Sequence, residues 1–213
     1  MDGEDKYTLV RENILNWYKD NKRDYPWRKS NNLYQILITE ILLQKTIALN
    51  VKKIYNDFFA NYIDFKAIYN ADITNLQSDI KELGLSNKRA QILKDLSTMI
   101  QTEYNGEIPQ NIELLKKING IADYVSNAFA CFGLNHRTFF FDVNIKRFIY
   151  RVFLSQGEKV KAESIYAELD RLLPKTNFKY LYWAILDFGN KICSKSKPKC
   201  ELCPIFEECL YYM

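Results

Sequence analysis

The sequence contains little glycine and almost no histidine. Its 213 residues include 7 glycines, 5 prolines and 1 histidine, against 15 tyrosines and 13 phenylalanines. Few stretches alternate between apolar and polar residues as half-buried strands do, whereas apolar residues recur at helical spacing along most of the length. We therefore predict an almost entirely helical, all-α protein. The lone histidine, His136, falls in a predicted loop, and we assign it no role.

The chain also lacks the segments that target a protein to a membrane. No signal peptide is recognisable at the N-terminus, and no apolar run approaches the roughly 18 residues that a spanning helix needs. We find no internal repeat, low-complexity tract or flexible linker, so a second domain would have to pack closely on the first. We expect a soluble intracellular protein with no membrane association, and nothing suggests more than a monomer. The formal net charge of +4 is weak evidence for a polyanionic partner.

Four of the five cysteines fall in the last 21 residues of the chain. Cys193, Cys200, Cys203 and Cys209 have the spacing C-x6-C-x2-C-x5-C, which in a reducing compartment favours a metal over disulfides. Four thiolates select zinc or an iron–sulfur cluster. Zinc ribbons usually pair two C-x2-C knuckles, and only one is present, so we predict a cubane [4Fe–4S] cluster. A zinc-stabilised helical protein is the alternative.

A basic loop lies between the first two of these cysteines. It reads S-K-S-K-P-K and carries Lys195, Lys197 and Lys199. We predict that these lysines contact phosphate, and a solvated charge run is the alternative interpretation. The fifth cysteine, Cys131, lies in an apolar helical pattern and is expected in the core.

The stretch from Ile118 to Arg147 carries the densest set of signals. Gly120 follows an amphipathic segment and precedes a mainly apolar run, which predicts a tight turn between two helices. Backbone N–H groups at the start of the second helix would then offer a seat for a phosphate. Further along, the poorly solvated run Thr138–Phe141 precedes Asp142, and we predict that Asp142 caps the helix that follows. Capping and catalysis can coexist.

A second carboxylate, Glu40, lies between Ile38 and Leu43 in an apolar helical segment. It either faces solvent on a polar stripe or is buried for a functional reason. The periodicity predicts helices over residues 7–20, 34–49, 51–60, 65–69, 73–83, 90–104, 112–118, 143–154, 162–173 and 180–193.

Several blocks of the sequence together resemble the helix-hairpin-helix base-excision DNA glycosylases related to endonuclease III and the adenine glycosylase MutY. The blocks are Y-P-W-R at 25–28, I-T-E-I-L-L-Q-K-T at 38–46, L-G-L-S-N-K-R-A at 83–90, the hairpin, F-D-V-N at 141–144 and the four cysteines. They occur in family order and cover nearly the whole chain. Within the family, the segment I-L-I-T-E-I-L-L is most similar to the mismatch-specific thymine/uracil glycosylases of the Mig type.

The resemblance implies a two-lobed fold. Residues 28–134 would form a six-helix barrel with the helix-hairpin-helix, and residues 1–27 with 135–213 would form an iron–sulfur cluster domain carrying the catalytic aspartate. Double-stranded DNA with a mismatched or damaged base would lie across the cleft, with the target nucleotide flipped out. Such a protein would be cytoplasmic or associated with the nucleoid.

The resemblance also implies roles for particular residues. Asp142 matches the catalytic aspartate, which stabilises the oxocarbenium-like transition state. Glu40 matches the glutamate that protonates the departing base in adenine-releasing members. Asn144 matches a polar residue near the aspartate. Tyr124 stands where bifunctional members have a Schiff-base lysine, so little or no strand cleavage is expected.

Other matched positions would contact DNA or select the base. Gln44, Lys45 and Thr46 match the segment that enters the duplex. The remaining expected DNA contacts are Leu85, Asn87, Lys88, Gly120, Ala122 and the three lysines of the cysteine loop. Ala48 and Trp183 match positions near the base pocket.

The sequence departs from the family pattern at three of these places. Asn119 and Ala122 replace the usual proline and second glycine of the hairpin, which alters the phosphate seat. Trp183 replaces a smaller residue, which bears on substrate choice. Ala48 is small where the MutY type tends to have valine, and the chain ends soon after Cys209, whereas MutY enzymes carry a further domain. Both observations favour the Mig type.

We therefore expect a monofunctional glycosylase that removes a mispaired thymine or uracil, opposite guanine, in base excision repair. One alternative is a MutY-like adenine glycosylase acting at A opposite G or 8-oxoguanine. Another is a catalytically silent protein that binds damaged or structured DNA.

Overall fold

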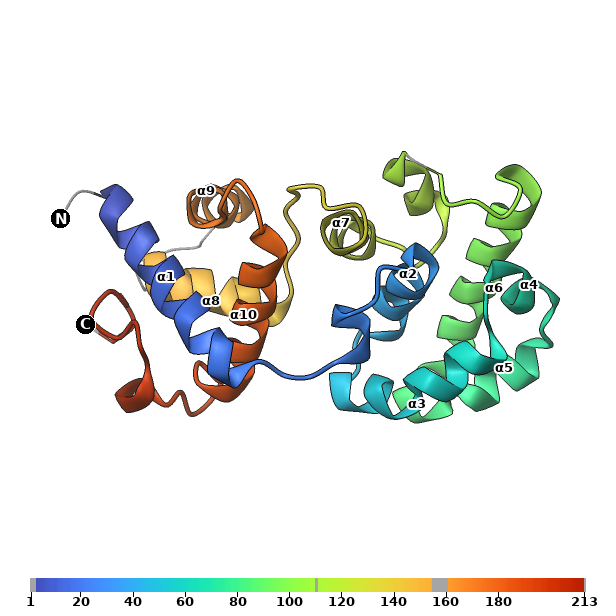
Figure 1. The fold of residues 1–213 in the computed structure, drawn as a ribbon, viewed down its shortest axis with the longest axis horizontal. Helices are drawn as coiled ribbons and strands as arrows, with labels where there is room; N and C mark the ends of the chain where they lie inside the picture. Colours follow the sequence, from blue (N-terminus) through green and yellow to red (C-terminus); the bar gives the residue numbers. More distant parts are fainter. Residues whose placement is uncertain (1–2, 110, 155–160, 213) are drawn as a thin grey trace. The chain divides into compact units, whose positions relative to one another are not determined.

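The computed structural model describes residues 3–109, 111–154 and 161–212, and all regular secondary structure in these ranges is helical (Figure 1). The predicted all-α fold is confirmed. The chain divides into two compact units. We call residues 24–138 the central unit and residues 1–23 with 139–213 the terminal unit. The boundaries expected from the sequence, after residues 27 and 134, lie close to these.

The central unit is a bundle of six α-helices within its described residues. Its elements are η1 (Pro26–Arg28), α2 (Leu33–Leu42), α3 (Ala48–Asn61), α4 (Phe65–Asn70), α5 (Ile73–Asp79), η2 (Lys81–Leu83), α6 (Ser86–Glu103), η3 (Ile112–Lys117) and α7 (Asp123–Phe132). Asn32, Asp64 and Asp72 cap α2, α4 and α5 with their side-chain oxygens.

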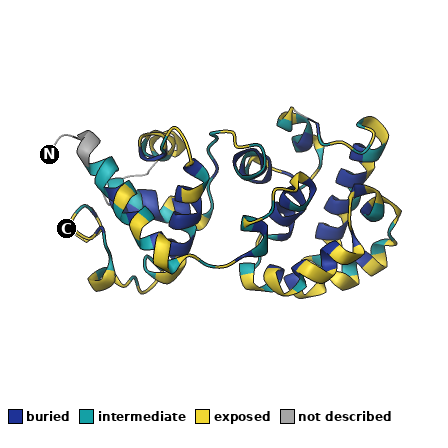
Figure 2. Ribbon diagram, in the orientation of Figure 1, coloured by how far each residue is buried: buried dark blue, intermediate teal, exposed yellow. Residues whose placement is uncertain are grey.

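Helix α2 is the core element of this unit, because eight of its ten residues are buried (Figure 2). It packs against α3, α6 and α7. Aromatic rings extend the packing beyond α2: Tyr34 makes edge contacts with Phe59 and Phe65 at centroid distances of 5.7 and 4.8 Å. A helix surrounded on so many sides is apolar nearly all round, and this accounts for the composition of α2.

The terminal unit combines the two ends of the chain. Its elements are α1 (Gly3–Asn21), α8 (Val143–Phe153), α9 (Ala162–Leu172), α10 (Phe178–Lys191) and η4 (Cys200–Leu202). Helix α10 packs on α1 and α8, and Phe188 makes edge contacts with Trp17 and Phe148 at 5.2 and 5.9 Å. Asp187, which is fully buried, accepts bonds from the backbone N–H and the Nε of Arg23 at 2.8 and 2.6 Å. This pair fixes the end of α1 to α10.

Two predicted helix limits are wrong. The helix predicted over 34–49 ends at Leu42, and residues 43–47 form a loop in which Lys45 has a left-handed φ of 52°. The helix predicted from Ala90 begins at Ser86, so Asn87 and Lys88 lie in its first turn. At the end of α2, a bond from the distant residue Arg89, described below, accompanies the local backbone bonds.

The remaining predicted elements agree with the structure to within a few residues. Gly120 has a φ of +105° between η3 and α7, which confirms the predicted tight turn, although the segment before it is a 3₁₀ helix. Gly84, with a φ of 72°, ends η2 as expected. In the part of the chain that the structure describes, no helix has the length and apolar character needed to span a bilayer.

Replacing Gly120 with alanine should destabilise the protein, since a Cβ there would lie 2.4 Å from Ile92 Cδ1 as well as impose a left-handed backbone on alanine. We expect urea unfolding to show a loss of about 1–3 kcal/mol for the backbone and about 1–3 kcal/mol more for the overpacking. Gly84→Ala is the matched control, because its φ is also positive but no atom lies within 4 Å of the new Cβ. Equal losses for both variants would contradict the packing argument.

Candidate functional site

Asp142 is the N-cap of α8, as predicted. Its Oδ1 accepts hydrogen bonds from the backbone N–H groups of Asn144 and Ile145 at 2.8 and 2.7 Å. Its Oδ2 accepts one from Asn144 Nδ2 at 2.6 Å. The helix N-terminus and these donors all favour a negative charge on the carboxylate. The structure therefore brings together two of the predicted catalytic residues, Asp142 and Asn144.

A guanidinium continues this network towards the cysteines. Arg147 donates through Nη2 to Asn144 Oδ1 and to the carbonyl of Gly189, both at 2.7 Å, and through Nε to the carbonyl of Cys193 at 2.8 Å. Helices α8 and α10 approach closely here, because a Cβ on residue 189 would lie 2.9 Å from Asn144 Cβ. Asp142 is thus connected by side-chain bonds to the start of the cysteine loop.

The apolar run before Asp142 packs within the terminal unit. Phe140 is buried and stacks on Tyr182 at a centroid distance of 4.2 Å. Phe141 makes an edge contact with Tyr166 at 4.6 Å. These contacts anchor the residues directly before Asp142, which is itself partly buried.

Glu40 is buried, with only 4% of its surface exposed. The buried interpretation is therefore confirmed and the solvated face is excluded. Burial raises the pKa of Glu40 from 4.5 to about 8, and the positive charge of Arg28 opposes the shift. Among the described residues, Glu40 Oε2 has no hydrogen-bond partner. A carboxyl group in this environment is mostly protonated at neutral pH and can donate its proton.

Two of the segments that were predicted to contact DNA are linked in the central unit. Gln44 donates through Nε2 to the carbonyl of Gly120 at 3.0 Å, joining the 43–47 loop to the hairpin. Lys45, Asn87 and Lys88 are exposed, Thr46 is partly buried, and Leu85 exposes 59% of its surface.

The hairpin differs from a simple phosphate seat. Ala122 is the N-cap residue of α7 and makes no side-chain capping bond. Asp123 follows in the first turn, where its Oδ1 lies 2.7 Å from Lys116 Nζ. The carboxylate of Asp123 places a negative charge at this helix end, which opposes the binding of a phosphate, and the ion pair with Lys116 offsets part of that charge.

The structure also locates Tyr124, which stands at the Schiff-base position, and the two residues predicted near the base pocket. Tyr124 is partly buried on α7 and packs against the core of the central unit. Ala48 is the first residue of α3 and belongs to the central unit, whereas Trp183 is buried on α10 in the terminal unit, in edge contact with Tyr180 at 5.5 Å. The roles of Ala48 and Trp183 in base selection, and the role of Tyr124 in catalysis, stay predictions.

The four C-terminal cysteines influence one another electrostatically. Burial raises the pKa of the Cys203 thiol to about 12, and Cys209, Cys193 and Cys200 raise it further. Within the described ranges, no three His, Cys, Asp or Glu side chains are positioned to hold a single metal ion. The donors here are all thiols, the set that iron–sulfur clusters take.

Arg151 connects the two ends of the cysteine segment. Its Nη1 donates to Cys193 Sγ at 3.3 Å and to the carbonyl of Ser194 at 2.7 Å, and its own carbonyl accepts from Cys209 Sγ at 3.4 Å. Arg151 therefore holds the backbone and the sulfur at the start of the segment and the sulfur near its end. Lys195, Lys197 and Lys199 are exposed on the loop in between. The type of donor present, four thiols in one short segment, is therefore the type that a cluster takes.

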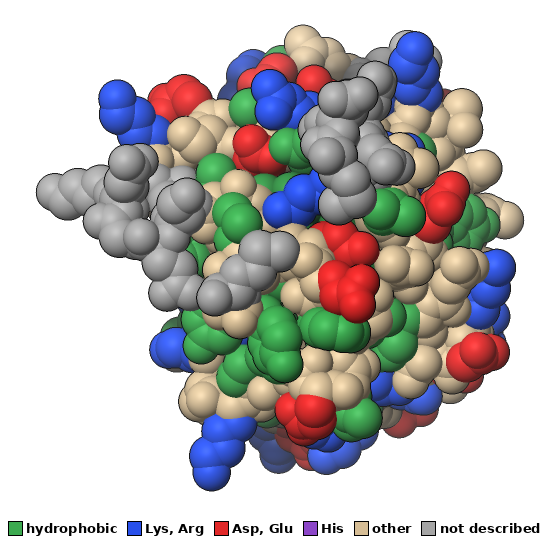
Figure 3. Space-filling view, turned by 90° about the vertical axis from the view of Figure 1, so that its left-hand side faces the viewer, with side chains coloured by type: hydrophobic (Ala, Val, Ile, Leu, Met, Phe, Trp, Pro, Cys, Tyr) green, Lys and Arg blue, Asp and Glu red, His purple; other side chains and the backbone are tan. Residues whose placement is uncertain are grey.

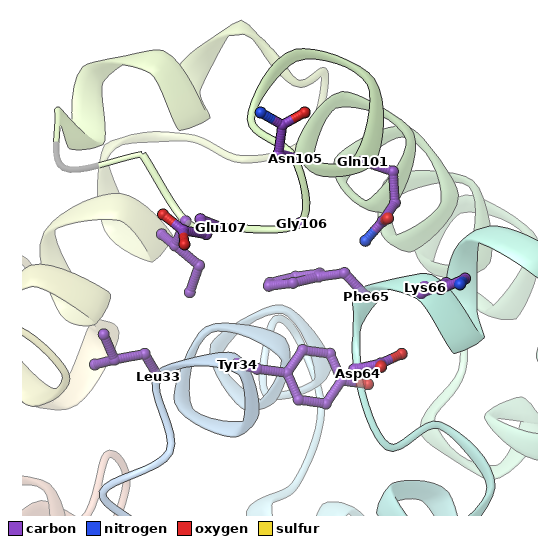
Figure 4. A pocket seen from close by; sticks show the side chains of 10 residues that line it. Leu33, Tyr34, Asp64, Phe65, Lys66, Gln101, Asn105, Gly106 and Glu107 are labelled. Carbon is purple, nitrogen blue, oxygen red and sulfur yellow. The ribbon is translucent and has the colours of Figure 1, made fainter.

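Two features of the surface lie outside this set of residues. A cavity of about 470 Å³ in the central unit is lined by Tyr34, Asp64, Phe65 and neighbouring residues from α6 and the loop after it, and none of the predicted site residues contributes to it (Figure 4). On the face shown in Figure 3, the visible Lys and Arg side chains are interspersed with Asp and Glu, and they form no continuous basic band among the described residues.

Comparison with known proteins identifies the family. Residues 38–175 match the family described as "HhH-GPD superfamily base excision DNA repair protein". The chain belongs to this superfamily. A thymine/uracil-DNA glycosylase from Methanothermobacter thermautotrophicus is 35% identical to it over 93% of this chain and 91% of its own length.

Solved structures and a second class of relatives agree with this placement. The structure of a thermostable thymine-DNA glycosylase superposes with a TM-score of 0.90 at 34% identity, covering 98% of this chain and 97% of that one. An adenine DNA glycosylase from Mycobacterium tuberculosis is 30% identical over 91% of this chain but only 64% of its own length. The HhH-GPD fold, which the sequence analysis predicted, is therefore confirmed.

Two arginines of this HhH-GPD protein were not predicted as site residues. Arg147 links Asn144 to the cysteine loop, and Arg89 bonds to two of the predicted DNA-contacting segments. Arg89 had a detectable signal, because it shares a helical face with the apolar Ile92 and Leu93. Arg147 lies in a helix shortly after its N-cap, and nothing in the neighbouring sequence distinguishes it from an ordinary surface cation.

The raised pKa of Glu40 makes the stability of the protein depend on pH. Since the folded state holds this proton up to about pH 8 and the unfolded state releases it near 4.5, unfolding becomes easier as the pH rises between these values. The variant Glu40→Gln lacks this titration. The free energy of unfolding can be measured in urea at several pH values for both proteins. The value for Glu40→Gln minus the value for the wild type should increase from pH 5 to pH 8, because only the wild type loses stability through this group. A difference that stays constant or falls over this range would contradict the assignment.

Proposed function

We propose that this protein is a monofunctional DNA glycosylase of base excision repair, which acts as a monomer inside the cell on thymine or uracil mispaired with guanine. The observation that carries the proposal is the Asp142 carboxylate, held by three N–H donors at a helix N-terminus in a chain of the HhH-GPD superfamily. The names of the relatives and the thymine-DNA glycosylase structure support the choice of base.

Asp142 acts on the sugar in this proposal. As the C1′–N1 bond breaks, its electron pair leaves with the base and positive charge develops on the deoxyribose. A fixed carboxylate stabilises that charge without reorganising. Asp142 then accepts a proton from the water that adds to C1′. The bonds from Asn144 and the α8 backbone keep the carboxylate in one orientation throughout.

Glu40 acts on the departing base. The pyrimidine leaves with a negative charge, which a proton from the neutral Glu40 carboxyl removes. The raised pKa of about 8 suits this role, because the group is protonated at neutral pH and is still acidic enough to donate. Glu40 is buried on α2 among apolar residues of the same helix, and this burial keeps the carboxyl group protonated.

Tyr124 accounts for the absence of strand cleavage in the proposal. A lyase step requires an amine that forms a Schiff base with C1′, and a phenol cannot form one. The product is therefore an intact abasic site, which alkali converts to a strand break.

The C-terminal cysteines would hold a [4Fe–4S] cluster. The ligands are Cys193, Cys200, Cys203 and Cys209, and the cluster when bound supplies a rigid cross-link for the loop, not redox chemistry. The guanidinium of Arg151 donates to the sulfur of Cys193 and would hold this ligand in place. Lys195, Lys197 and Lys199 would then contact DNA phosphates from the loop.

An adenine glycosylase is the second candidate, and Glu40 favours it. A neutral carboxyl group suits protonation of a purine nitrogen at least as well as it suits a pyrimidine. Adenine DNA glycosylases are also among the relatives, although this chain spans less than two thirds of the length of the one from Mycobacterium tuberculosis.

Base release from a panel of duplexes tests the proposal. Each duplex carries T, U or A opposite each of the four bases or opposite 8-oxoguanine, and alkali reveals abasic sites after incubation. We expect strand breaks at T and U opposite G, only after alkali. Release of adenine alone would move the assignment to the second candidate, and breaks without alkali would exclude a monofunctional enzyme. No release from any duplex would indicate a protein that only binds DNA.

A further inference from the structure

Arg89 is a buried cation without a carboxylate partner. It exposes only 3% of its surface, and among the described residues it forms no ion pair. Its guanidinium instead donates to three backbone carbonyls: Gln44 through Nη2 at 2.6 Å, Ile41 through Nε at 3.4 Å, and Gly84 through Nη1. Burying an unpaired charge is costly. A residue kept in this state has a specific task.

Two of the three carbonyls, those of Ile41 and Gln44, lie close together in the chain and are joined by the bond from the Gln44 backbone N–H to the Ile41 carbonyl at 3.3 Å, whereas the third, of Gly84, comes from a distant part of the sequence. Ile41 lies in the last turn of α2, Gln44 begins the loop of residues 43–47, and Gly84 ends η2 just before α6. We call residues 43–47 the first loop and residues 84–85 the second loop. Arg89 fixes the distance between them.

Both loops carry strained backbone and exposed apolar side chains. Lys45 in the first loop and Leu85 in the second each have a φ of 52°, a conformation that residues other than glycine rarely adopt. Leu85 is 59% exposed and Ile47 is 67% exposed. Exposed aliphatic side chains of this kind can act as wedges that unstack neighbouring base pairs.

We propose that Arg89 is a positioning residue that holds the first and second loops at a fixed spacing, so that they open the duplex together. The inference rests on the proposed function, because it assigns to these loops the work of extracting a base. In this proposal Arg89 does not contact DNA. It contributes by bonding to carbonyls of both loops, so that neither loop moves independently of the other.

The geometry requires arginine at this position. The planar guanidinium presents donors in several fixed directions, and it bonds here to three carbonyls on three segments. Lysine would keep the charge but concentrate it at one point, so it could hold at most part of the set. Gln44 extends the assembly, because its side chain bonds to Gly120 in the hairpin.

The variant Arg89→Lys tests the proposal with two duplexes and single-turnover rates. In one duplex uracil is paired opposite guanine, and in the other it faces a stable abasic analogue and needs no extraction. We expect the rate on the paired duplex to fall about tenfold or more, and the rate on the unpaired duplex to change less than about twofold. Equal losses on both duplexes would show a general defect and overturn the proposal.

A binding measurement separates this inference from the proposed activity. A duplex with 2-aminopurine beside the mismatch fluoresces more strongly when the protein unstacks it, whether or not a base is released. Arg89→Lys should reduce the rise at saturating protein, and Ile100→Val, a small core change elsewhere on α6, should not. An unchanged rise in Arg89→Lys would refute the positioning role even if the protein proves to be a glycosylase.

Surface variants keep the test informative if Arg89→Lys does not fold. Lys45→Ala and Leu85→Ala alter exposed side chains, one on each loop, and should leave the fold intact. Each single variant is expected to reduce the fluorescence rise by some factor. If the loops act together, the factor for the double variant is smaller than the product of the two single factors. Independent, multiplicative effects would contradict the proposal.

Discussion

The functional part of the terminal unit depends on one hydrogen-bonded connection, which runs from the Asp142 carboxylate through Asn144 to Arg147 and on to the carbonyls of Gly189 and Cys193. It begins at the free N–H groups of α8, which would be unsatisfied without a cap. The same side chain that completes the helix is therefore the one available for chemistry. Through Arg147, its position is fixed to α10 and to the beginning of the cysteine segment.

The two carboxylates illustrate how environment divides the roles. Asp142 accepts hydrogen bonds from three N–H donors at a helix N-terminus, whereas Glu40 is buried on an apolar helix, and this burial raises its pKa. One group is prepared to stabilise positive charge on a sugar, and the other to give a proton to a leaving base. The environment of Asp142 results from packing within the terminal unit, and that of Glu40 results from packing within the central unit.

Much of this arrangement could be predicted from the sequence, because its signals are local. The N-cap at Asp142, the turns at Gly84 and Gly120 and the cysteine spacing each depend on a few neighbouring residues. The end of α2 at Leu42 could not be predicted, since the apolar pattern continues and the helix is interrupted where Arg89 bonds to the carbonyl of Gln44, 45 positions earlier in the chain. The role of Arg147 was missed for the same reason, because its partners at Gly189 and Cys193 come from far along the sequence.

The central claim is that the charge of Asp142 drives cleavage of the glycosidic bond. The most direct test is the single-turnover rate of uracil release from a G:U duplex by the Asp142→Asn variant, measured beside duplex binding and unfolding in urea. The amide oxygen of asparagine can still cap α8, so the variant should fold and bind DNA, while its rate falls at least about 100-fold. Retention of the wild-type rate by a folded, DNA-binding Asp142→Asn protein would contradict the account.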